Sequence, residues 1–212
     1  MGLCTTKGKF ITFEGAEGSG KSTQGALLYD YLKTRKKNVL LIREPGSVKI
    51  SEAIRRILLD VKNTKMTKAC ETLLYMAARS QLFEEVIAVA LKKGAIVLCD
   101  RFLDSTIVYQ GYGCGIDVNF IKQLGRFATG GIQPDLTFLF DIETKKGLSR
   151  KGKIKDRIEL RPLVYHNRVR QGYLDLAQQE PERITVIKAE CSREEIFAIV
   201  RRSVDRLLQY AN

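Results

Sequence analysis

Residues 15–22 read Gly-Ala-Glu-Gly-Ser-Gly-Lys-Ser and match the spacing G-x-x-x-x-G-K-S. The glycines let the backbone turn tightly, so that successive N–H groups face phosphate oxygens. Lys21 adds positive charge at the phosphates, and Ser22 supplies a hydroxyl that can ligate Mg²⁺. The pattern predicts a site for ATP or GTP. It leaves open whether the γ-phosphoryl group passes to water or to a second substrate.

Two further segments carry charged residues that could contact an anion. Arg43-Glu44-Pro45-Gly46 is followed, on a helical segment, by Arg55, and Asp100 is followed directly by Arg101. An aspartate at a strand end can hold Mg²⁺ or its waters, and a neighbouring arginine can bind a second phosphate group. Each segment could equally form a turn or an intramolecular ion pair.

Aromatic and polar residues in two other segments could bind a base. Tyr75 and Arg79 are four residues apart and share a helix face, where they could stack on a base and hydrogen-bond its edge. Further hydrogen-bonding side chains fall within about one and a half helical turns, at Ser105, Thr106, Tyr109 and Gln110. The alternatives are a core aromatic capped by a surface arginine and an ordinary polar helix surface.

The elements that must position these residues alternate along the chain. Strand-like runs cover 9–14, 38–43, 95–100, 135–141 and 183–188. Helical periodicity covers 21–35, 50–59, 68–93, 118–129, 161–179 and 192–209. Because parallel strands need crossover helices, we expect one α/β domain over residues 1–212, a P-loop NTPase-type three-layer sandwich with a five-stranded parallel sheet flanked by helices. Ligands of such sheets bind beyond the carboxyl ends of the strands.

The composition excludes several classes of protein. The 212-residue chain is 44% hydrophobic, which excludes disordered, collagen-like and disulfide-framework proteins. Its five cysteines are scattered and it has one histidine, so we expect free thiols and no zinc site. No apolar run approaches the roughly 18 residues of a membrane-spanning helix, and no secretory leader is visible. We therefore expect a cytoplasmic protein without a membrane partner.

The net charge is +12, from 36 Lys and Arg against 24 Asp and Glu, which favours anionic partners without identifying them. Basic residues gather in a segment that also contains two glycines, at Lys145, Lys146, Arg150, Lys151, Lys153, Lys155 and Arg157. We expect this segment to form a basic loop.

Together these segments resemble the thymidylate kinases, a family of nucleoside monophosphate kinases. The matching segments, in the family's order, are 13–24, 43–46, 73–79, 100–102, 109–111, 134–136 and 156–159. The resemblance implies transfer of the γ-phosphoryl group of ATP to dTMP, giving ADP and dTDP for dTTP synthesis, with Mg²⁺ required. It also implies small-molecule partners only, no nucleic acid, and a homodimer to which residues 68–93 and 118–129 could contribute.

The resemblance also implies a role for each matching residue. ATP would be bound by Gly15, Ala16, Glu17, Gly18, Ser19, Gly20, Lys21, Ser22 and Thr23, and the metal by Ser22 and Asp100. The dTMP site would consist of Glu17, Arg43, Glu44, Pro45, Arg55, Tyr75, Arg79, Asp100, Arg101, Ser105, Thr106, Tyr109 and Gln110. Within it, the ring of Tyr109 would crowd the ribose 2′ position. The basic segment, at about 143–157, would form a lid over ATP.

The resemblance is to the bacterial type, which places the catalytic arginine in the lid. Because positions 17–19 hold Glu, Gly and Ser, no arginine lies inside the phosphate loop, and Arg150 is the candidate beside Lys21 and Arg101. The lid departs from the family pattern in its lysines at 151, 153 and 155 and in being about two residues shorter, and Ser47 stands where Gly is usual. Lysine lacks the planar fork for bidentate contact with oxygens.

Two other functions compete with this prediction. A kinase for a different monophosphate or for a nucleoside would share the phosphate loop and differ in the base pocket. A nucleic-acid-binding P-loop module would account for the net charge of +12. The sequence has no basic stripe interleaved with aromatic residues, which argues against the second alternative.

Overall fold

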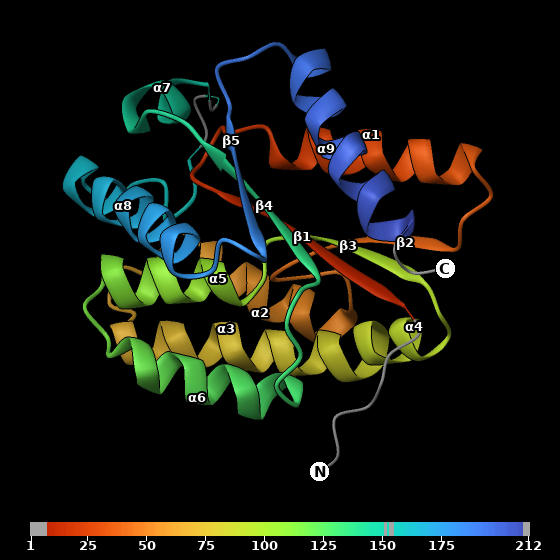
Figure 1. The fold of residues 1–212 in the computed structure, drawn as a ribbon. Coiled ribbons are helices and arrows are strands. Elements are labelled where there is room, and N and C mark those ends of the chain that lie inside the picture. Colours follow the sequence, from red (N-terminus) through yellow and green to blue (C-terminus); the bar gives the residue numbers. More distant parts are fainter. Residues whose placement is uncertain (1–7, 151, 153–154, 210–212) are drawn as a thin grey trace.

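The computed structural model describes residues 8–150, 152 and 155–209 and contains one parallel sheet (Figure 1). Its strands are β1 (Lys9–Gly15), β2 (Val39–Arg43), β3 (Ile96–Asp100), β4 (Leu136–Asp141) and β5 (Ile184–Lys188), in the spatial order β2-β3-β1-β4-β5. The predicted α/β class and the five-stranded parallel sheet are confirmed. Four strands begin one residue later than predicted, and the residues left out, Asn38, Ala95, Asp135 and Arg183, each still make one backbone hydrogen bond at the end of the ladder.

Helices cover both faces of the sheet, as Figure 1 shows. On one face lie α1 (Lys21–Thr34) and α9 (Arg193–Gln209). On the other lie α2 (Lys49–Leu59), α3 (Lys68–Leu82), α4 (Ala88–Lys92), α5 (Leu103–Thr106), α6 (Val118–Thr129) and α8 (Leu163–Gln179). Along β1, Phe10 packs into the cluster under α3 and α4, whereas Ile11 and Phe13 pack toward α1 and α9. The sheet is therefore buried on both faces, as its apolar strands require.

Three helical segments differ from the predictions. The segment 68–93 is interrupted by a π-helical turn, Phe83–Ile87, between α3 and α4, and a second π-helical segment, Ile107–Gly113, continues α5. Helix α8 begins at Leu163 rather than at Arg161, because Pro162 lies in extended backbone immediately before it.

The prediction of a basic loop is wrong for the first part of that segment. Residues Thr144–Ser149 form helix α7, and the carboxylate of Glu143 caps its first turn by accepting hydrogen bonds from the backbone N–H groups of Lys145 and Lys146. This cap satisfies backbone donors that a short helix would otherwise leave unpaired. The basic residues Lys151 and Lys153 lie outside the described residues.

Within the described residues, the helices are too short or too polar to cross a bilayer.

Candidate active site

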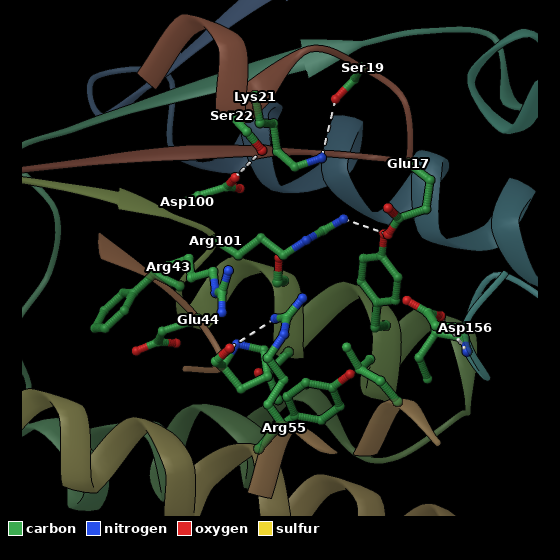
Figure 2. Close-up of a pocket in the computed structure, with 18 of the residues that line it drawn as sticks. Glu17, Ser19, Lys21, Ser22, Arg43, Glu44, Arg55, Asp100, Arg101 and Asp156 are labelled. Atoms are coloured by element: carbon green, nitrogen blue, oxygen red, sulfur yellow. Dashed lines mark hydrogen bonds and ion pairs between the residues drawn. The ribbon is translucent and has the colours of Figure 1, made fainter. Parts of the chain in front are cut away.

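A cavity of about 360 Å³ lies where β1, β2 and β3 end (Figure 2). All the predicted dTMP-site residues line it: Glu17, Arg43, Glu44, Pro45, Arg55, Tyr75, Arg79, Asp100, Arg101, Ser105, Thr106, Tyr109 and Gln110. Residues 18–23 of the predicted phosphate loop line it as well. A volume of this size is typical of sites for small molecules.

The phosphate loop leads from β1 into α1 and has the conformation that its glycines predict. Gly15, Gly18 and Gly20 have φ angles of +141°, +68° and +92°, which side-chain-bearing residues rarely adopt. Gly20 immediately precedes α1, so the N–H groups of the first turn face the cavity end of the loop. The loop is thus shaped to bind an anion with its backbone.

Lys21 is folded against this loop. Its Nζ donates hydrogen bonds to the carbonyl oxygens of Gly15 at 3.0 Å and Ala16 at 2.8 Å, and to Ser19 Oγ at 3.3 Å. Burial, reinforced by the positive charge of Arg101, lowers the pKa of Lys21 to about 8. The ammonium group therefore lies in a site where added negative charge would stabilise it.

Oxygen ligands for a hard cation lie beside the loop. Ser22 Oγ, in the first turn of α1, donates a hydrogen bond to Asp100 Oδ2 at the end of β3. A hydroxyl and a carboxylate are the ligand types that Mg²⁺ accepts from a protein when phosphates and waters complete its shell. The described residues contain no cluster of three or more His, Cys, Asp or Glu side chains placed to hold a metal by themselves. The donor set therefore fits Mg²⁺ bound together with phosphates.

Three arginines face the part of the cavity between the loop and α2. Arg101 has a left-handed backbone conformation, with φ +71°, and its guanidinium forms an ion pair with Glu17. Arg55 donates to the carbonyl oxygen of Pro45 at 2.8 Å, and Arg43 pairs with Glu52. Figure 2 shows the guanidinium groups of Arg43, Arg55 and Arg101 in the same region. Together they form a cationic site for a second phosphate group.

Glu14, to which no role was assigned, holds the turn that carries Arg101. Its carboxylate is buried and accepts hydrogen bonds from the backbone N–H of Phe102 at 2.6 Å, from Ser105 Oγ at 2.6 Å and from the hydroxyl of Tyr173 at 2.8 Å. Burial, with the nearby carboxylate of Asp104, raises the pKa of Glu14 to about 7. The hydroxyls of Ser105 and Tyr173 also accept from Arg101, so this network fixes its side chain.

The deepest part of the cavity contains a buried arginine. Arg79 donates from Nε to Glu44 Oε2 at 2.8 Å, and from Nη2 to the Phe102 carbonyl and to Thr106 Oγ1, both at 2.9 Å. Burial raises the pKa of Glu44 despite the positive charge of Arg79. Tyr75 lies one turn before Arg79 on α3 and lines the same cavity. A planar ring beside a fixed guanidinium can bind a heterocyclic base.

Tyr109 lines the cavity beside Glu17 and Arg101. Its hydroxyl donates to Glu17 Oε1 at 3.0 Å, and the guanidinium carbon of Arg101 lies 5.1 Å from its ring centroid. The ring is packed edge-on against Tyr165 and Tyr173. Because these contacts hold the ring on three sides, Tyr109 is a rigid wall of the cavity.

The structure places Arg150, Gly15 and Ala16 outside the residues that line the cavity. Arg150 follows α7 and is exposed, and its Nη1 contacts the carbonyl oxygens of Gly18 at 3.4 Å and Ala189 at 3.3 Å. The guanidinium thus lies against the outer side of the phosphate loop.

Sequence reasoning missed four residues that line the cavity: Leu59, Phe102, Asp156 and Ile158. Phe102, Asp156 and Ile158 lie within segments that match the family pattern. Membership of these segments was a signal that they could lie at the site, although no chemical role was assigned to them. Leu59 is the last residue of α2 and carries no such signal. Its place in the cavity depends on how α2 packs.

Comparisons with known proteins agree with the motifs. A family profile described as thymidylate kinase matches residues 13–200. The chain is similar to the thymidylate kinase of Roseiflexus castenholzii, 47% identical over 210 residues that cover 90% of this chain and 92% of that protein. It is also similar to the thymidylate kinase of Symbiobacterium thermophilum, 45% identical over 94% of each chain. The crystal structure of thymidylate kinase from Ehrlichia chaffeensis superimposes with a TM-score of 0.77, at 36% identity over 93% of this chain and 98% of that one.

Proposed function

This chain belongs to the thymidylate kinase family, and we propose that the cavity at the ends of β1, β2 and β3 is its active site. The reaction of the family transfers the γ-phosphoryl group of ATP to dTMP and yields ADP and dTDP, the precursor of dTTP. One observation carries the assignment: a phosphate loop, a cluster of three arginines and a pocket with a buried arginine line the same cavity. These three regions match, in that order, the donor phosphates, the acceptor phosphate and the base of the two substrates.

The phosphate loop binds the donor. Backbone N–H groups of residues 15–20 and the ammonium group of Lys21 hold the β- and γ-phosphates of ATP. Ser22 and Asp100 would hold Mg²⁺, which when bound neutralises charge on the phosphates. Lys21 exchanges its hydrogen bonds to loop carbonyls for bonds to phosphate oxygens, and the negative charge favours its protonated form.

The arginine cluster binds the acceptor. Arg43, Arg55 and Arg101 hold the phosphate of dTMP, with one of its oxygens directed at the γ-phosphorus. Phosphoryl transfer needs positioning and neutralisation of charge, and a phosphate oxygen is itself the nucleophile. Glu17, through its bonds with Arg101 and Tyr109, lies where the sugar of dTMP passes between phosphate and base. Tyr109 excludes a ribose 2′-hydroxyl.

The buried pocket binds the base. Tyr75 stacks on thymine, Arg79 donates to O4, and Thr106 and Gln110 lie at N3. Arg150 acts on the transferred phosphoryl group from the lid, an assignment supported by the contact of its Nη1 with the carbonyl oxygen of Gly18 in the phosphate loop. Family membership favours this substrate over the competing monophosphates and over nucleic acid.

An assay coupled to ADP formation tests the proposal. With ATP and Mg²⁺ fixed, dTMP, dUMP, CMP, AMP and GMP are offered separately. We expect the highest kcat/KM for dTMP. A higher value for CMP, AMP or GMP would contradict the assignment of the base pocket. Arg202→Ala, which removes an exposed arginine from α9, serves as the control for the Arg150→Ala variant discussed below.

We also propose that the protein is a homodimer. Phe120 and Phe127 lie on one face of α6 and are 49% and 89% exposed, and Leu73 on the adjacent α3 is 56% exposed. Burying these side chains against a second copy would remove apolar surface from water. Sedimentation velocity tests this: Phe127→Glu should shift the protein to monomer, and an unchanged mass would exclude this face as the interface. Location in the cytoplasm remains a prediction.

A further inference from the structure

The carboxylate of Glu71, in the first turn of α3, has no solvent exposure and contacts four side chains from distant segments, those of Gln110, Cys114, Arg157 and Arg161. Its Oε2 lies 2.6 Å from Arg157 Nη2 and 2.7 Å from Arg161 Nη2. Its Oε1 accepts a hydrogen bond from Gln110 Nε2 at 2.9 Å. Glu71 does not line the cavity, whereas Gln110 does.

This contact determines which end of the Gln110 amide faces Glu71. With two guanidinium groups at ion-pair distance, the Glu71 carboxylate acts as an acceptor of hydrogen bonds. The Gln110 amide must therefore turn its NH₂ group toward Glu71. Its Oε1 receives no hydrogen bond from any described residue, so the oxygen is the polar atom that Gln110 offers to the cavity.

An oxygen acceptor at this point distinguishes pyrimidines by their N3 edge. Thymine and uracil carry a hydrogen on N3 and donate there, whereas cytosine has an unprotonated N3 and accepts. We propose that Glu71 is a positioning residue for base selection, which holds Gln110 as an acceptor and so excludes cytosine. This inference rests on the proposed function, since it assumes a base beside Tyr75, Arg79 and Gln110.

The two arginines make the buried carboxylate tolerable. Burying one charge without a partner is unfavourable, and breaking such a pair is strongly destabilising. Arg157 is itself anchored, with Nε donating to the Leu58 carbonyl at 2.8 Å and its backbone N–H to the Leu59 carbonyl at 3.2 Å. Its neighbours Asp156 and Ile158 line the cavity. Glu71 therefore connects Arg157, at the end of the lid segment, with Gln110 in the wall of the base pocket.

The test is Glu71→Gln, which keeps the shape of the side chain and removes its charge. A glutamine can donate as well as accept, so Gln110 is free to turn its NH₂ group toward the cavity. We expect the ratio of kcat/KM for dCMP to kcat/KM for dTMP to rise by at least about tenfold, since a mismatched hydrogen bond at a base edge costs that much or more. The change should lie in KM more than in kcat.

A matched control separates selection from stability. Asp104→Asn breaks another largely buried ion pair, with Arg183, and Asp104 does not line the cavity. It should lower the melting temperature and leave the dCMP to dTMP ratio unchanged. An equal rise in the ratio for Asp104→Asn and Glu71→Gln would reduce Glu71 to a structural role and overturn the proposal.

A double-mutant cycle tests whether Glu71 affects base selection through Gln110. In a Gln110→Ala background, Glu71→Gln should have no effect on the ratio, because no amide remains to reorient. A persisting effect would overturn the proposal. If Glu71→Gln does not fold, judged by circular dichroism, the double variant Glu71→Gln with Arg161→Gln removes one carboxylate and one guanidinium together and should show the same rise. Failure of the wild-type chain to phosphorylate dTMP would instead refute the proposed function.

Discussion

The cavity has a donor side, formed by the phosphate loop, and an acceptor side, formed by the arginine cluster and the base pocket. The two sides are held together in different ways. On the donor side, α7 meets the phosphate loop through backbone: a Cβ on Gly18 would clash with the carbonyl oxygen of Gly147, and one on Gly147 with that of Glu17. The ion pair near this contact, Lys146 with Glu190, is about half exposed. On the acceptor side the base pocket is held by contacts between buried side chains, such as the ion pair of Arg79 with Glu44.

The difference predicts what substitutions on each side will change. Exposed ion pairs contribute at most about 1 kcal/mol each, so cations on the donor side can be removed without loss of the fold. Their removal should lower the rate of transfer. On the acceptor side, each polar group has partners that depend on it, so substitutions should change which monophosphate is accepted and how stable the protein is.

The largest effect is expected from Lys21→Ala. Lys21 contacts loop carbonyls rather than the core, and in the proposed function it binds the phosphates of ATP. Activity should therefore fall by at least about a thousandfold, a loss typical of removing a principal charge from a phosphoryl-transfer site. Circular dichroism should be unchanged. Lys33→Ala, an exposed lysine at the other end of α1, is the control and should stay active. A Lys21→Ala variant with a tenth of wild-type activity would invalidate the donor-side assignment.

Arg150→Ala should lower kcat by at least about a hundredfold, below the range seen for essential arginines because neighbouring lysines can substitute in part. The KM for dTMP should move little, since Arg150 does not line the acceptor pocket. Steady-state kinetics at saturating ATP measure both. If Arg150→Ala keeps near-normal kcat while Lys153→Ala or Arg157→Ala loses it, the catalytic role belongs to that residue.

A smaller effect, on selectivity, is expected at Tyr109. Tyr109→Ala should narrow the preference for dTMP over its ribonucleotide analogue by about tenfold, because it removes the ring that excludes the 2′-hydroxyl. Tyr109→Phe keeps the ring and loses only the bond to Glu17, so it should retain the preference. Equal kcat/KM ratios in wild type and Tyr109→Ala would place the 2′ position elsewhere.

The smallest effect concerns pH. Lys21 is charged below its pKa of about 8 and loses its proton as the pH rises through that value. Because kcat/KM reports ionisations of the free enzyme, its value for ATP should fall about fourfold between pH 7 and pH 8.5. At saturating ATP the bound phosphates keep Lys21 protonated, so kcat should stay level. A level kcat/KM up to pH 9 would show that Lys21 keeps its charge in the free enzyme.

Local sequence determined the phosphate loop, the sheet and the set of segments that meet at the site. The glycines of residues 15–20 specify a turn that few other residues can adopt, and the apolar strands with intervening helical periodicity specify a parallel sheet. The motifs after β1, β2 and β3 converge because parallel strands end at one edge. Every residue predicted for the dTMP site therefore lies in one cavity.

Tertiary structure alone decided how these residues are held. Local periodicity gives no sign that Glu14 supports the turn at Arg101, or that Glu71 meets Arg157, Arg161 and Gln110, because each contact joins segments distant in sequence. Helix α7, which replaces the predicted loop, has a local cap in Glu143, but its position depends on the close approach of Gly147 to the phosphate loop. Residue types and spacing specify which chemistry is present, whereas the orientation of each group depends on partners that only packing brings together.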